Sequence, residues 1–152
     1  MNFLIYHNLL RWAVLLFGLW TVFNAIGGFF SKREFSRQDN VSTLLFMISC
    51  DIQLLLGLLL YFSNGWFGKL KSDMGAVMKN AGDRFFTVEH IFMMLTAWVL
   101  VHVGRSAIKR TANDHIKHKR MLIYFGIALL LILAAIPWPF RAADIGRPLF
   151  QF

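Results

Sequence analysis

The stretch Met121–Trp138 reads MLIYFGIALLLILAAIPW and contains no charged side chain. A helix rises about 1.5 Å per residue, and about 20 apolar residues cross the hydrocarbon core of a bilayer. The stretch is too long and too rich in leucine for a strand of an outer-membrane barrel, and it lacks the alternation of such strands. It therefore predicts a transmembrane helix.

The composition of the whole chain agrees with this stretch. Its 152 residues are 57% hydrophobic and only 16% charged, whereas soluble domains are about 45–50% apolar and about 25% charged. A soluble domain would lack the polar residues that cover a core, and a disordered chain would need low hydrophobicity. The composition excludes both classes and leaves an integral membrane protein.

Three further apolar stretches resemble the first one. We expect a single membrane domain, residues 1–152, folded as an all-α, up-down bundle of four transmembrane helices at about 3–26, 41–62, 85–105 and 120–138. The first span predicts a retained helix and not a signal peptide, because no basic segment precedes it. Residues 64–83 carry apolar residues at helical spacing, which predicts an amphipathic helix in the interface, with an irregular loop as the alternative.

Basic residues are more frequent on one side of this bundle. Nine lysines and arginines lie near the connections between spans one and two and between spans three and four, against six on the opposite side. Because these residues favour the cytoplasm, we expect a multi-pass protein of the bacterial inner membrane with both termini in the periplasm. The net charge of +8 then reflects this excess and contact with anionic lipids, and we expect no nucleic-acid partner.

Polar side chains inside a bilayer are costly, so each is a candidate functional residue. His7 and His90 lie at one level, about 6–7 Å into the first and third spans. These spans are diagonal neighbours in an up-down bundle, and two imidazoles on facing helices can bind one haem iron from both sides. The positions predict a haem b site near the outer surface, with Arg84 as a partner for the haem propionates.

Other candidate residues lie elsewhere in the same helices and at the start of the fourth span. His102 and His118 lie toward the inner side and are candidate ligands of a second haem, although His118 sits in a basic segment where a histidine can simply be solvated. Arg11 and Gly18 lie on the same face of the first helix as His7. Gly18 allows the close approach of either a flat macrocycle or a neighbouring helix.

Two further polar residues lie deep in the predicted spans. Asp51 lies at a depth similar to that of Arg11, which predicts a buried ion pair, with a proton or quinone site at Asp51 as the alternative. Gln53 lies on a different face of the second span and is expected to hydrogen-bond a neighbouring helix. Glu89 would either orient a ligand from another helix or face the lipid headgroups. The single Cys50 excludes an internal disulfide and fits a packing role.

Several short motifs together resemble a known group of proteins. They are HNLLRW at 7–12, VEHIFMM at 88–94, HVGR at 102–105, KHKR at 117–120, IPWPFR at 136–141 and GRP at 146–148. Over essentially the whole chain they are similar to small four-helix bacterial membrane proteins labelled cytochrome b, and in broad plan to the cytochrome b561 group. The resemblance implies membrane electron transfer through b-type haem, with His7, His90, His102 and His118 as ligands.

The sequence therefore favours a membrane b-type cytochrome that carries electrons through one or two bis-histidine haems. Quinol and a redox protein at the outer face are its candidate partners, and self-association is left open. Such a chain is either a quinol-linked oxidoreductase or an electron-transfer subunit without turnover of its own. The alternative is a haem-free structural or assembly subunit of a larger membrane complex. A small transporter ranks last, because the sequence shows neither an inverted repeat nor a broken helix.

Overall fold

The computed structural model describes residues 3–150 of the chain. Four helical segments in it are long and apolar enough to cross a membrane: α1 (Phe3–Ser31), α2 (Arg37–Ser63), Ala81–Lys109 and α7 (Asp114–Ala135). The predicted all-helical fold with four membrane-spanning helices is confirmed, and the chain is a multi-pass membrane protein.

The third membrane segment is built from three consecutive parts. They are α5 (Ala81–Arg84), a π-helical turn (Phe85–Glu89) and α6 (His90–Lys109). A π-helical turn has a wider hydrogen-bonding ring than the α-helix and is frequent at functional sites. Here it lies directly before His90, and the backbone N–H of His90 donates to the carbonyl of Phe85.

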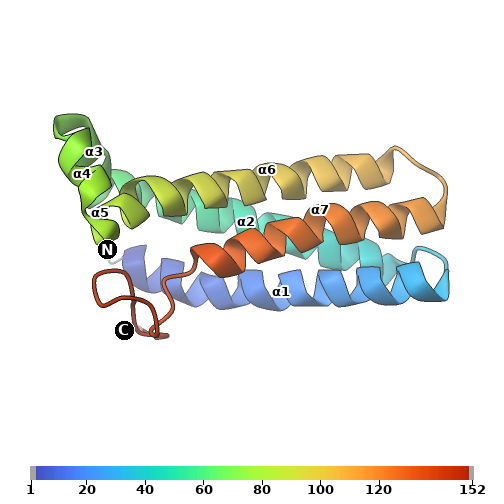
Figure 1. Ribbon diagram of the computed structural model, residues 1–152. Coiled ribbons are helices and arrows are strands. Elements are labelled where there is room, and N and C mark those ends of the chain that lie inside the picture. Colours follow the sequence, from blue (N-terminus) through green and yellow to red (C-terminus); the bar gives the residue numbers. More distant parts are fainter. Residues whose placement is uncertain (1–2, 151–152) are drawn as a thin grey trace.

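The four long segments run up and down in one bundle (Figure 1). α1 packs against α2 and α7, whereas α6 packs against α7 and, more loosely, against α2. The segments α1 and α6 are therefore diagonal to each other, as predicted for the first and third spans. Both ends of the chain lie at the same end of the bundle as α3 (Trp66–Ser72) and α4 (Met74–Lys79).

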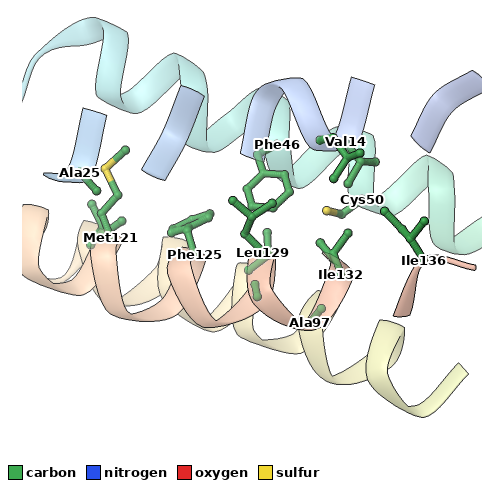
Figure 2. Close-up of a cluster of buried hydrophobic side chains, with 14 residues drawn as sticks. Val14, Ala25, Phe46, Cys50, Ala97, Met121, Phe125, Leu129, Ile132 and Ile136 are labelled. Atoms are coloured by element: carbon green, nitrogen blue, oxygen red, sulfur yellow. The ribbon is translucent and has the colours of Figure 1, made fainter. Parts of the chain in front are cut away.

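One face of α7 supplies much of the buried core. Its members recur at spacings of three and four residues, which places them on one side of a helix. These residues are Met121, Phe125, Leu129 and Ile132, and Ile136 continues the series directly after the helix; all five are at most 5% exposed. Figure 2 shows this face directed at α1 and α2, where Phe46 is fully buried and Cys50 joins the same cluster.

Polar caps extend α2 beyond its apolar run. The helix begins at Arg37 and not at residue 41, because Ser36 and Asp39 form a reciprocal capping box. Arg33 donates to both carboxylate oxygens of Asp39, at 2.6 and 2.7 Å, and so closes the link between α1 and α2. These hydrogen bonds raise the pKa of the Arg33 guanidinium above its ordinary value. α1 likewise continues past residue 26 to Ser31.

α7 is shifted toward the N-terminus relative to the predicted span at 120–138. It begins at Asp114 because the Asn113 side chain caps it, accepting from the backbone N–H of Ile116 at 3.0 Å. It ends at Ala135 because Pro137 and Pro139 cannot donate to the preceding turn.

The segment 64–83 was predicted as one amphipathic helix and forms three short ones. Asp73 accepts a hydrogen bond from the backbone N–H of Ala76 and starts α4, and Asn80 accepts from that of Asp83 and starts α5. A side chain that caps a new helix also interrupts the one before it. The helical character of the segment is confirmed, and its continuity is wrong.

We expect Gly104 to fix the closest approach of α6 to α7. A Cβ atom on Gly104 would lie 2.5 Å from Tyr124 Cβ, whereas one on Gly126 would meet nothing within 4 Å. Gly104→Ala should therefore destabilise the bundle by about 1–3 kcal/mol, while the control Gly126→Ala should be neutral or stabilising by up to about 1 kcal/mol. Thermal unfolding in detergent measures both, and equal midpoints would contradict this packing.

Candidate functional site

A cavity of about 260 Å³ lies inside the bundle near the end that holds both chain termini. All four long helices contribute to its wall, together with Trp66 of α3 and Arg147 of the C-terminal tail. Most of its lining is apolar, and no aspartate or glutamate within residues 3–150 lines it. A pocket of this kind suits a mainly apolar ligand that carries negative charge.

Two imidazoles face each other in this cavity. His7 of α1 and His90 of α6 both line it, with ring centres 6.4 Å apart and ring planes at 67°. Their helices are diagonal, so the two rings approach from opposite sides of the bundle interior. The structure thus brings together the two histidines that sequence depth paired.

The orientation of His90 follows from a proline that lies just after α7. In a continuing helix the Ala135 carbonyl would accept a hydrogen bond from the N–H of residue 139, but Pro139 has no N–H. That carbonyl instead accepts a hydrogen bond from His90 Nδ1 at 2.8 Å. Because a carbonyl only accepts, Nδ1 carries the proton and Nε2 keeps its lone pair. Within the described chain, His90 Nε2 has no hydrogen-bond partner.

Pro137 acts in the same way two residues earlier, about half a helical turn. Pro137 cannot donate to the carbonyl of Leu133. This carbonyl accepts from Trp138 Nε1 at 2.9 Å. The sequence alone indicates this arrangement. Two prolines two residues apart leave two carbonyls of the preceding turn without a backbone donor, so side chains can donate to them.

Two residues of α2 fix the position of His7, one by hydrogen bonding and one by leaving space for the ring. Gln53 Nε2 donates to the His7 carbonyl at 3.0 Å and lies 3.3 Å from His7 Nε2. An amide NH₂ only donates, so Nε2 is the lone-pair nitrogen of His7. Gly57 makes room for the ring, because a Cβ there would lie 3.2 Å from His7 Cε1. The expected contact of Gln53 with a neighbouring helix is confirmed.

Arginines supply the positive charge around this cavity. Arg11 is only 7% exposed, and its Nη2 donates to the carbonyl of Leu149 while its Nε finds no partner within residues 3–150. Arg147 lines the cavity and stacks its guanidinium 4.7 Å from the ring centre of Phe86. Arg141 Nη1 is also buried without a partner in the described chain. Unpaired buried donors of this kind favour an anionic ligand.

Two residues expected near a cofactor lie outside the cavity wall. Arg84 donates to Glu89 at 2.7 Å, with both side chains more than one-third exposed, whereas Arg11 and Arg147 line the cavity. A Cβ on Gly18 would lie 3.0 Å from Leu129 and 3.1 Å from a core phenylalanine. Gly18 therefore serves helix packing at this position.

The predicted ion pair between Arg11 and Asp51 is wrong. Asp51 Oδ1 instead accepts hydrogen bonds from Trp98 Nε1 and His102 Nε2, each at 2.7 Å. Depth along a helix does not fix the direction in which a side chain leaves the helix. Asp51 faces α6, whereas Arg11 faces the C-terminal tail.

The inner pair of histidines is not brought together. His102 is held by Asp51 on the α2 side of α6. His118 is fully buried on α7, where a Cβ on Gly28 of α1 would overlap its ring and where Phe35 lies 5.4 Å away. The two imidazoles thus face different neighbours, and their positions give no support to a second bis-histidine site.

No family model matches the chain, and no curated protein or solved structure matches it either.

We expect Gln53 to hold the His7 ring in place. Gln53→Leu removes the only donor to His7 Nε2 within the described chain, which should lower the free energy of unfolding by about 1–3 kcal/mol. Gln38→Leu, at an exposed position in the first turn of the same helix, is the matched control and should change it little. Thermal unfolding in detergent compares the two, and an equal effect of both substitutions would contradict the role of Gln53.

Proposed function

We propose that the protein is a membrane b-type cytochrome in which His7 and His90 hold one haem. The observation that carries this proposal is the separation of 6.4 Å between the two ring centres. First-row metals bind imidazole nitrogen at about 2 Å, and a ring with bonds of about 1.33 Å has its atoms about 1.1 Å from its centre. Two imidazoles on opposite sides of one metal therefore have centres about 6 Å apart.

The donor set also favours haem over a bare metal ion. Within residues 3–150, no three His, Cys, Asp or Glu side chains gather into a metal site. A bare transition metal needs about four protein or water ligands. Two axial imidazoles are sufficient when a macrocycle supplies the other ligands, as in cytochromes with bis-histidine haem.

The charge of the cavity wall suits the periphery of the same cofactor. Haem b is a flat apolar body with two propionate carboxylates at one edge. The apolar lining would cover the body, and the donors on Arg11 and Arg147 of the cavity wall, together with Arg141 of the C-terminal tail, would bind the carboxylates through charge-assisted hydrogen bonds. This assignment gives the unpaired buried nitrogens of Arg11 and Arg141 a partner.

When bound, haem supplies one-electron redox chemistry, and the chain supplies orientation and surroundings. The Ala135 carbonyl fixes the His90 ring and increases the basicity of its free nitrogen. A ligand at His7 Nε2 would replace the long contact with Gln53, which keeps its shorter bond to the His7 carbonyl.

We place the protein in the bacterial inner membrane with both termini in the periplasm. The excess of basic residues at the opposite end of the bundle supports this orientation. The cavity then lies at the periplasmic end, where a redox protein partner would meet it. A C-terminal alkaline phosphatase fusion, which is active only outside the cytoplasm, should be active, and an inactive but stable fusion would reverse the orientation.

Removing either proposed ligand should remove the haem. The purified protein, expressed with ample haem, should give the reduced-minus-oxidised absorbance spectrum of low-spin haem b. His7→Ala and His90→Ala should each lose most of this signal, because one imidazole alone leaves the iron with an open axial position.

The matched control is His115→Ala. His115 is exposed and stacks on Phe29 at 4.7 Å, far along α7 from the cavity, so its loss should leave the spectrum unchanged. A colourless wild-type protein would refute the proposal and favour a haem-free structural or assembly subunit. Full haem content in both ligand variants would refute the pairing of His7 with His90.

A further inference from the structure

A second polar site lies on the outside of the bundle between α2 and α6. It consists of Asp51, Trp98 and His102, and we call it the seam cluster. Asp51 and His102 expose 40% and 36% of their side chains, although Asp51 lies near the middle of α2, about 18 Å from its nearer end. Polar side chains that face outward at this depth are costly and mark functional sites.

The hydrogen-bonding capacity of the seam cluster is only partly used. Both of its internal hydrogen bonds end on one oxygen, Asp51 Oδ1. Within the described chain, Oδ2 has no hydrogen-bond partner, and neither has His102 Nδ1. Because His102 Nε2 donates to the carboxylate, the tautomer with the proton on Nε2 has its lone pair on Nδ1. The cluster therefore offers two free acceptors and no free donor.

The surroundings of these acceptors are apolar. Exposed aliphatic side chains flank the cluster on both helices, namely Ile48, Ile52 and Leu55 on α2 and Leu95, Val99 and Val103 on α6. A ligand that reaches the cluster must come from the hydrocarbon phase and must bring hydroxyl or N–H donors. A second copy of this chain would bring only the same two acceptors to a symmetric contact on this face.

We propose that the seam cluster binds the hydroxyl headgroup of a lipid-soluble hydroquinone. A hydroquinone hydroxyl donates to Asp51 Oδ2 or to His102 Nδ1, and its ring lies against the aliphatic side chains. The oxidised quinone carries carbonyl acceptors in place of these donors, so the cluster discriminates in favour of the reduced form.

The location of the cluster connects it to the bundle interior. Trp98 donates to Asp51 and also lines the cavity that contains His7 and His90. Binding of the hydroquinone stands on the seam cluster alone, whereas its use as a source of electrons would rest on the proposed function. The two proposals therefore fail separately.

The test compares three probes on the full chain in lipid nanodiscs, with empty nanodiscs to subtract partitioning. The probes are duroquinol, duroquinone and the dimethyl ether of duroquinol, which share one ring and differ in their hydroxyl donors. Isothermal titration calorimetry should give duroquinol a Kd at least about tenfold lower than that of either other probe. Only duroquinol can donate a hydrogen bond to the charged carboxylate, and such a bond contributes about a factor of ten or more in affinity. Equal binding of duroquinol and its dimethyl ether by the unmodified protein would by itself overturn the proposal.

A pair of variants locates the site. Asp51→Asn should weaken duroquinol binding about tenfold or more, because it removes the carboxylate acceptor. Asp144→Asn, in the exposed C-terminal tail, should leave the Kd unchanged. Unchanged binding in a folded Asp51→Asn variant would overturn the assignment to the seam cluster. A colourless protein that binds duroquinol would support the seam cluster and refute the proposed haem. A protein that contains haem but does not bind duroquinol would refute the seam cluster and leave the haem proposal standing.

Discussion

A bilayer offers no hydrogen-bond partners, so each polar group of this bundle must find one within the protein or in a ligand. Most do so between helices. Arg105 of α6 donates to Thr43 Oγ1 at 2.6 Å on α2, the Ala135 carbonyl accepts from His90, and Asp51 accepts from two side chains of α6. These contacts join helices that also pack through the apolar face of α7, so polar satisfaction and packing select the same arrangement.

The exceptions to this rule carry the functional argument. Arg11 Nε, which is buried without a partner in the described chain, belongs to a residue that lines one cavity at the end of the bundle that holds the termini, and Arg141 Nη1 of the C-terminal tail is likewise unpaired within residues 3–150. The same cavity holds two imidazoles with their centres 6.4 Å apart. A flat, apolar, anionic cofactor with an iron at its centre would satisfy the imidazoles and the arginines together. This convergence distinguishes the proposal from a structural subunit, which would leave these groups unpaired.

Apolar runs and helical rise were sufficient to predict the four spans, their antiparallel order and the shared level of His7 and His90. Helix ends were not predictable from apolar runs, because the Ser36–Asp39 box and Asn113 extend helices into polar sequence. The partners of deep polar groups were also missed, since depth does not fix direction: Asp51 turns to α6 and not to Arg11. The role of Ala135 was readable in principle, because Pro139 leaves its carbonyl free.

The most direct test of the central claim is electron paramagnetic resonance of the oxidised, purified protein, combined with its haem-to-chain ratio. Coordination of one iron by His7 and His90 predicts one haem per chain with a low-spin ferric signal. It also predicts that any haem retained by His7→Ala is high-spin, because one axial ligand is missing. A high-spin wild-type protein, or a low-spin signal that survives unchanged in that variant, would contradict the claim.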